Sequence, residues 1–97
     1  MEYVNFGTAG VKVSRIALGM GLREQYSAEE AERLVRHAID SGVNFIDCAN
    51  RYGLGDDRVK LKGTAEQILG RVIKTRRDEV VITSKVTGAT GGGPNDL

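Results

Sequence analysis

The sequence predicts an α/β fold in which parallel strands alternate with helices. Apolar segments that suit strands begin near residues 16, 43 and 80, and two segments of a different pattern separate them. In both of these, apolar residues recur every three or four positions, as on the buried face of an amphipathic helix. Because a β-α-β-α-β order normally gives parallel strands joined by right-handed crossovers, we expect one small sheet with helices packed against it.

Size, composition and charge limit the kind of protein. The chain has 97 residues, of which 40% are hydrophobic and 28% charged, so it is neither a disordered tail nor a membrane protein. Its net charge is +1 with both signs mixed, which offers no surface for nucleic acid. One cysteine and one histidine exclude an internal disulfide and a structural zinc site. With so few cysteine and histidine ligands, we expect no metal. No signal peptide is recognisable, so we expect a cytoplasmic location.

A β-hairpin is expected first. Residues 3–6 and 11–13 alternate in polarity on either side of Gly7-Thr8-Ala9-Gly10. Glycine adopts the positive φ angles that a tight hairpin turn requires. Residues 16–18 are a brief apolar run stopped by Gly19-Met20-Gly21, which predicts a buried strand that ends in a loop.

The first helix is predicted between Ser27 and Gly42. Ser27 lies three residues before Glu30, the capping-box pattern in which both side chains accept from unpaired amides at the helix start. Gly42 favours the end of the helix. The residues expected on the buried face are Ala31, Leu34, Val35, Ala38 and Ile39.

A second strand, a loop, a second helix and a third strand follow. Residues 43–47 suit a buried strand, and residues 52–63 form a polar loop whose charged part, 56–62, is expected to be solvated. Thr64 is interpreted as the N-cap of the second helix, with Gln67 completing a capping box. The buried face of this helix is expected to be Ile68, Leu69, Val72 and Ile73.

Residues 80–84 predict the third strand, and residues 87–97 are interpreted as a loop. The apolar start of this strand suits a parallel strand covered on both faces. Strand–helix units of roughly 30 residues occur both in eight-stranded barrels and in doubly wound sheets, so spacing alone leaves the two architectures open.

Three polar side chains follow predicted strands. Asp47 ends the second strand, Tyr52 lies in the next loop, and Lys85 ends the third strand. Ligands bind at this edge of parallel α/β folds. A lysine beside an apolar strand needs a carboxylate partner, and Asp47 is the expected one.

An ammonium near a phenol lowers its pKa from about 10, which would make Tyr52 a general acid. The chemistry that this suits is protonation of a carbonyl oxygen as hydride reaches its carbon. On spacing alone, an exposed Lys85 and an ordinary loop aromatic at Tyr52 are the more common outcome.

The motifs around these residues resemble those of the aldo-keto reductases. Asp47 to Gly53 fits the family signature D-x-A-x-x-Y-G, and Gly63 to Gly70 is similar to the helix that follows it. Val81 to Lys85 is similar to the lysine-bearing strand of the family, and all three occur in the family order. The resemblance implies a (β/α)8 TIM barrel whose bottom is closed by the hairpin, and which uses NADPH to reduce an aldehyde or ketone.

Carried over by position, the resemblance implies roles for single residues. Tyr52 would be the proton donor, Lys85 the residue that tunes its pKa, and Asp47 the ion-pair partner that also approaches the nicotinamide ribose. Members similar to potassium-channel β subunits contact the cofactor at positions that correspond to Met20, Gly21 and, less closely, Gln25.

The same resemblance implies that residues 1–97 are a partial domain. They would hold the hairpin, about three strands and two helices of the barrel, truncated after the third strand. The family has a further catalytic histidine on the next strand, whereas the one histidine present, His37, is expected on the surface of the first helix. The chain by itself is therefore expected to be inactive.

Alternatives stay open beside this hypothesis. The chain could be a non-catalytic binding or assembly module, or a degenerate remnant, that self-associates through open sheet edges. Gly19-x-Gly21 after a strand is a weak dinucleotide fingerprint, because position 24 is glutamate. Cys48 follows an apolar strand and is expected to be a buried structural thiol.

Overall fold

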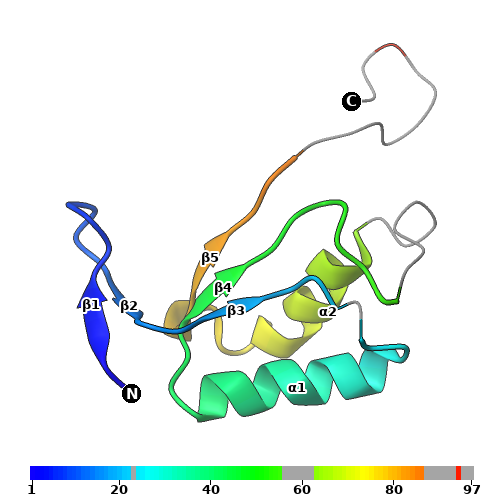
Figure 1. The fold of residues 1–97 in the computed structure, drawn as a ribbon, viewed down its shortest axis with the longest axis horizontal. Helices are drawn as coiled ribbons and strands as arrows, with labels where there is room; N and C mark the ends of the chain where they lie inside the picture. The colour runs from blue at the N-terminus through cyan, green and yellow to red at the C-terminus, as the bar shows by residue number, and fades with distance from the viewer. Residues whose placement is uncertain (23, 56–62, 87–93, 95–97) are drawn as a thin grey trace.

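A computed structural model describes residues 1–22, 24–55, 63–86 and 94 (Figure 1). The predicted solvated segment 56–62 and nearly all of the predicted loop 87–97 lie outside these residues. Among the residues described, neither helix is long and apolar enough to cross a membrane. The elements, in chain order, are strands β1 (Tyr3–Asn5), β2 (Lys12–Ser14) and β3 (Ala17–Gly19), helix α1 (Ala28–Asp40), strand β4 (Phe45–Asp47), helix α2 (Thr64–Ile73), the short 3-10 helix η1 (Arg77–Glu79) and strand β5 (Val81–Thr83).

The predicted hairpin is confirmed. β1 and β2 pair antiparallel with Val4 opposite Val13, and Gly7 and Gly10 have φ angles of 57° and 80°. The hairpin lies at one side of the main sheet (Figure 1), and Asn44 fastens it there. The main-chain N–H of Ser14 donates to Asn44 Oδ1 at 2.6 Å, and the N–H of Asn44 donates to Ser14 Oγ at 3.1 Å.

The main sheet has three parallel strands in the order β3-β4-β5, as the alternation of strands and helices predicted. Gly19 on β3 is in register with Asp47 on β4, which is in register with Thr83 on β5. The main-chain ladder continues past the strand ends, because the N–H groups of Met20 and Cys48 donate to the carbonyl oxygens of Asp47 and Thr83, both at 2.8 Å. These strand ends therefore form one aligned edge.

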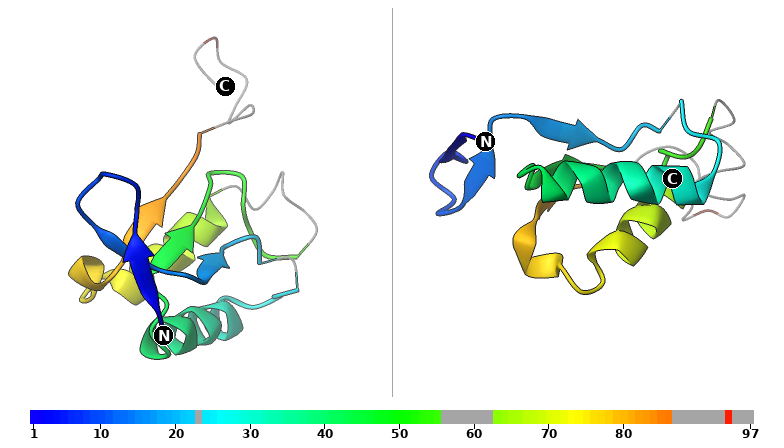
Figure 2. Two further views of the ribbon diagram at one scale, coloured as in Figure 1. Left: turned by 60° about the vertical axis from the view of Figure 1, so that its left-hand side comes forward. Right: turned by 90° about the horizontal axis from the view of Figure 1, so that it is seen from below.

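Both helices pack against the sheet and lie side by side (Figures 1 and 2). Each presents the apolar residues of one face to a common core that includes Ile46 of β4. Leu34 is an exception, since it was expected in the core and is 40% exposed. It lies beside the i, i+4, i+8 row of α1 and not on it. The buried helix residues are Ala31, Val35 and Ile39 of α1, and Ala65, Ile68, Leu69, Val72 and Ile73 of α2.

The predicted burial of the first and third parallel strands is wrong. Ala17 and Gly19 of β3 are exposed, and Ile16 just before them is 63% exposed. β3 is an edge strand of the described sheet, and the main core lies between the sheet and the two helices. β5 lies at the other edge, and all three of its residues are half-buried.

The two helices begin in different ways. Ser27 caps α1 as predicted, because its Oγ accepts from the N–H of Glu30 at 3.1 Å. The capping box predicted at Thr64 is wrong, since Thr64 is the first residue of α2 and the N-cap is Gly63, with φ 74° and no side-chain cap. Main-chain oxygens of the preceding loop accept hydrogen bonds from N–H groups at the start of the helix instead. Those of Asn50 and Tyr52 accept from the N–H groups of Gly63 at 2.7 Å and Ala65 at 3.1 Å.

Candidate active site

An ion pair joins the ends of β4 and β5. Lys85 Nζ lies 2.7 Å from Asp47 Oδ1, so the pairing predicted from the sequence is present. Thr83 is the register partner of Asp47, and side chains two residues apart on an extended segment point to the same face. Lys85 therefore extends from the same face as Thr83, next to the aspartate. The side chains of Lys85 and Asp47 are 46% and 42% exposed.

Thr83 completes this pair, and the sequence reasoning missed it. Its Oγ1 donates to the same oxygen, Asp47 Oδ1, at 2.6 Å. The signal was available, since Thr83 lies two residues before Lys85 in a predicted strand. Hydrogen bonds from Lys85 and then from Thr83 hold the pKa of Asp47 below its ordinary value. The hydrogen bond to Asp47 in turn raises the pKa of Lys85.

Tyr52 lies against the same lysine. Lys85 Nζ is 5.2 Å from the centre of the Tyr52 ring, within the range of a cation–π contact. The ring is partly buried and packs against the core. Its main chain is held on both sides, because its N–H donates to the carbonyl oxygen of Ala49 at 3.2 Å and its carbonyl oxygen accepts from Ala65. The structure thus brings Asp47, Tyr52 and Lys85 together.

The predicted cofactor contacts lie in the loop that follows β3. The N–H of Met20 donates to the main chain of Asp47, which places Met20 and Gly21 beside the aspartate strand. The whole of Met20, main chain included, is 0% exposed, whereas Gly21 is half-buried. Among the described residues, and apart from the immediate chain neighbours, no atom lies within 4 Å of a Cβ built on Gly19 or Gly21, so these residues leave the edge open.

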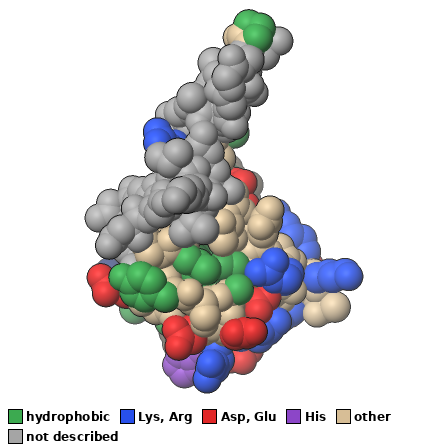
Figure 3. Space-filling model, turned by 90° about the vertical axis from the view of Figure 1, so that its right-hand side faces the viewer, with side chains coloured by type: hydrophobic (Ala, Val, Ile, Leu, Met, Phe, Trp, Pro, Cys, Tyr) green, Lys and Arg blue, Asp and Glu red, His purple; other side chains and the backbone are tan. Residues whose placement is uncertain are grey.

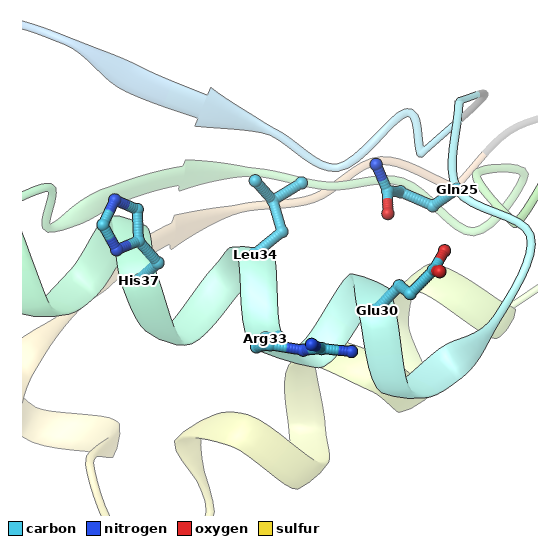
Figure 4. Close-up of a pocket in the computed structure, with 5 residues that line it drawn as sticks. All are labelled: Gln25, Glu30, Arg33, Leu34 and His37. Carbon is cyan, nitrogen blue, oxygen red and sulfur yellow. The ribbon is translucent and has the colours of Figure 1, made fainter.

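Gln25 lines a different part of the surface from the Asp47–Lys85 ion pair. It lines a shallow hollow of about 460 Å³ with four residues of α1, and its own position is in the loop before that helix (Figure 4). Its carbonyl oxygen accepts from the N–H of Gly55 at 2.9 Å, which joins this loop to the one that carries Tyr52. The residues of α1 that line the hollow are Glu30, Arg33, Leu34 and His37.

The two other candidate residues, His37 and Cys48, lie where the sequence predicted them. His37 is exposed on α1, as predicted, and the one histidine side chain shows at the surface among acidic and basic side chains (Figure 3). Cys48 is 1% exposed, and burial raises the pKa of its thiol, so the predicted buried thiol is confirmed. Among the described residues, no three His, Cys, Asp or Glu side chains are grouped to hold a metal ion.

Fold and site together define an α/β protein with parallel strands whose carboxyl ends carry an aspartate, a lysine and a neighbouring tyrosine. The chain belongs to the aldo/keto reductase family, because the model of that family matches residues 6–96. The described elements are accordingly the N-terminal part of a (β/α)8 barrel, and by themselves they do not close a barrel.

Relatives of this family resemble the chain along its length. It is 36% identical to the uncharacterized oxidoreductase YrpG of Bacillus subtilis over 100% of the chain and 31% of that protein. It is also 36% identical to a protein named as a probable voltage-gated potassium channel subunit beta of Arabidopsis thaliana, over 99% of the chain and 28% of that protein. The chain thus spans about a third of the length of these curated relatives or less.

A solved structure agrees with the fold. The crystal structure of the putative aldo-keto reductase from Pseudomonas aeruginosa superposes with a TM-score of 0.68 at 29% identity. The match covers 98% of the chain and 34% of that protein.

The described edge fits the ribose end of a nicotinamide cofactor, the group that the family resemblance implies. The Asp47 carboxylate is 42% exposed, so it can accept from a sugar hydroxyl while it keeps Lys85. Open space above Gly19 and Gly21 leaves room beside it. Asp47 and the main chain of Gly21 are the residues that would hold this end.

Proposed function

We propose that these residues supply the proton-donating part of the active site of an NADPH-dependent carbonyl reductase. The supporting observation is that Lys85 Nζ lies 2.7 Å from Asp47 Oδ1 and 5.2 Å from the centre of the Tyr52 ring. A cation beside a phenol can stabilise the negative charge that develops on the phenol oxygen as its proton leaves. The three side chains stand at the carboxyl ends of parallel strands, where barrels of this class bind their ligands.

In this proposal Tyr52 is the general acid. A bound nicotinamide supplies the hydride that reaches the carbonyl carbon. Tyr52 gives its phenolic proton to the carbonyl oxygen, so an aldehyde or ketone becomes an alcohol. The Lys85 ammonium stabilises the phenolate left on Tyr52, and Asp47 balances the charge of the lysine.

Asp47 has a second role in the proposal, since its exposed carboxylate would accept from a ribose hydroxyl. Gly21 would contribute main-chain groups from the loop that follows β3. The preference for NADPH over NADH rests on the resemblance alone. A cytoplasmic location also stays a prediction.

A second candidate is a non-catalytic binding or assembly module. Apolar side chains exposed on the described residues favour it, among them Ile16 at 63%, just before the edge strand β3, and Phe6 at 41%, in the hairpin. Such side chains would suit self-association. A measurement of carbonyl reduction distinguishes the reductase from the non-catalytic module.

The decisive experiment places these residues in a complete barrel. Residues 1–97 replace the matching N-terminal segment of the Pseudomonas aeruginosa relative, and NADPH oxidation is followed with a panel of aldehydes and ketones. We expect turnover in the chimera and a loss of roughly a thousandfold in kcat for Tyr52→Phe, with NADPH affinity retained. Tyr26→Phe removes another phenol, from an exposed tyrosine, and is the matched control.

Two results contradict the proposal. Unchanged kcat in Tyr52→Phe excludes Tyr52 as the proton donor. A chimera that folds like its parent by circular dichroism, yet reduces no carbonyl compound that the parent reduces, favours the binding module.

A further inference from the structure

We propose that Thr83 is a positioning residue of the site, whose hydroxyl fixes the Asp47 carboxylate in the orientation that holds the Lys85 ammonium beside Tyr52. The consequence for catalysis rests on the proposed function. The positioning itself rests on contacts among three side chains of β4 and β5.

The first support is that two donors meet on one atom. Thr83 Oγ1 and Lys85 Nζ lie 2.6 and 2.7 Å from Asp47 Oδ1. An ionised carboxylate only accepts hydrogen bonds, so the Thr83 hydroxyl must be the donor. Hydrogen bonds to a charged acceptor are shorter and stronger than neutral ones, which suits the 2.6 Å distance.

The second support is a difference in rigidity between the two donors. Thr83 is β-branched, with few allowed rotamers, and lies on a strand whose main chain is bonded on both sides of it. Its carbonyl oxygen accepts from Cys48 at 2.8 Å, and that of Lys85 accepts from Asn50 at 3.0 Å. Lys85 carries a long, 46% exposed side chain. The short hydroxyl therefore fixes the carboxylate, and the ammonium follows.

The third support concerns what the ion pair achieves alone. Exposed ion pairs are weak because holding two flexible side chains in one geometry costs entropy. Without the hydroxyl, the Asp47 carboxylate is free to turn, and the ammonium loses its fixed place near the ring. Removal of Thr83 Oγ1 should also weaken the preference of Asp47 for its ionised form.

Three variants of the chain test this. Thr83→Val removes the hydroxyl and keeps the branched shape, and Thr83→Ser keeps a hydroxyl. Ser84→Ala is the matched control, because it removes the adjacent hydroxyl, which donates to Glu66 Oε1 at 2.8 Å. The carboxyl ¹³C signal of Asp47 is titrated by NMR, and amide spectra check the fold.

The Asp47 titration midpoint should rise in Thr83→Val, return towards wild type in Thr83→Ser, and stay unchanged in Ser84→Ala. In the chimera, Thr83→Val should lower kcat roughly tenfold with little change in the KM for NADPH. An unmoved midpoint in Thr83→Val overturns the proposal, as does an equal shift in Ser84→Ala. If the Asp47 midpoint moves in Thr83→Val but the chimera without this substitution has no activity, the reductase function is refuted and the positioning role stays intact.

Discussion

Thr83 Oγ1 lies 2.6 Å from Asp47 Oδ1, and these two residues are also register partners on neighbouring parallel strands. The hydrogen bond therefore depends on the alignment of β4 with β5. A slip of one residue would turn Thr83 to the opposite face of the sheet. The strand register thereby supports the ionised form of Asp47, to which the hydrogen bond from Lys85 contributes most and the one from Thr83 next.

Acid should weaken the contribution of Asp47 to stability. Its pKa is lower in the folded chain than in the unfolded chain, where it is about 3.9. The stabilisation is therefore present above the unfolded pKa and disappears as the pH falls through the lower folded pKa. In urea titrations, the gap between wild type and Asp47→Asn should be constant near pH 7 and shrink below about pH 4.

Alkali should act on Lys85 in the opposite sense. Its folded pKa is raised, so its contribution is complete below the unfolded pKa of about 10.4 and falls as the pH rises through the folded pKa. Both side chains are more than 40% exposed, so the effects are small and decrease with added salt. If the free energies of unfolding of wild type and Asp47→Asn differ by the same amount at pH 7 and pH 3, the account of Asp47 is contradicted.

Ser27→Ala should destabilise the chain by about 1 kcal/mol. The substitution removes the oxygen that accepts from the N–H of Glu30, at the start of α1. Thr64→Ala is the control, since Thr64 lies inside α2 and no side chain caps that helix. Urea unfolding followed by circular dichroism at 222 nm measures both. An equal loss of unfolding free energy in the two variants would mean that Thr64 does cap α2, as the sequence predicted.

Gly63→Ala should destabilise the chain by roughly 1–2 kcal/mol, because an L-residue is strained at its left-handed φ of 74°. Gly70→Ala, in the middle of α2 with no atom within 4 Å of the added Cβ, should stabilise it by about 0.5–1 kcal/mol. The same urea titration reports both. Opposite signs are the expected result, and two losses of similar size would mean that backbone conformation is not the cause.

The Cys48 thiol should react slowly in the folded chain. It is 1% exposed and burial raises its pKa, so little reactive thiolate is available. A disulfide reagent should label it many times faster in 6 M guanidinium chloride than in buffer. The chain contains one cysteine, so a single absorbance trace measures it. Equal rates in the two solvents would refute the burial.

Much of the arrangement was predictable because it depends on local patterns. The order of strands and helices follows from periodicity, and the Asp47–Lys85 pair follows from opposite charges at neighbouring strand ends. Burial was less predictable. Leu34 and Ile16 are apolar in sequence, but their exposure depends on which elements pack over them.

The other differences have causes outside local sequence. Thr64 does not cap α2, because loop carbonyl groups that come from residues 50 and 52 take that role. The spacing of Thr83 and Lys85 places both side chains on one face of the strand, but the strand register is needed to show that both bond the same oxygen of Asp47. In both cases the deciding partner lies more than ten residues away in sequence.

Main-chain hydrogen bonds join the Tyr52 loop to the start of α2. A backbone hydrogen bond is available to almost every residue type. The side chains of the bonded residues could therefore change during evolution without loss of these hydrogen bonds. The same scaffold could in this way acquire a new substrate pocket around the phenol that we propose as the proton donor.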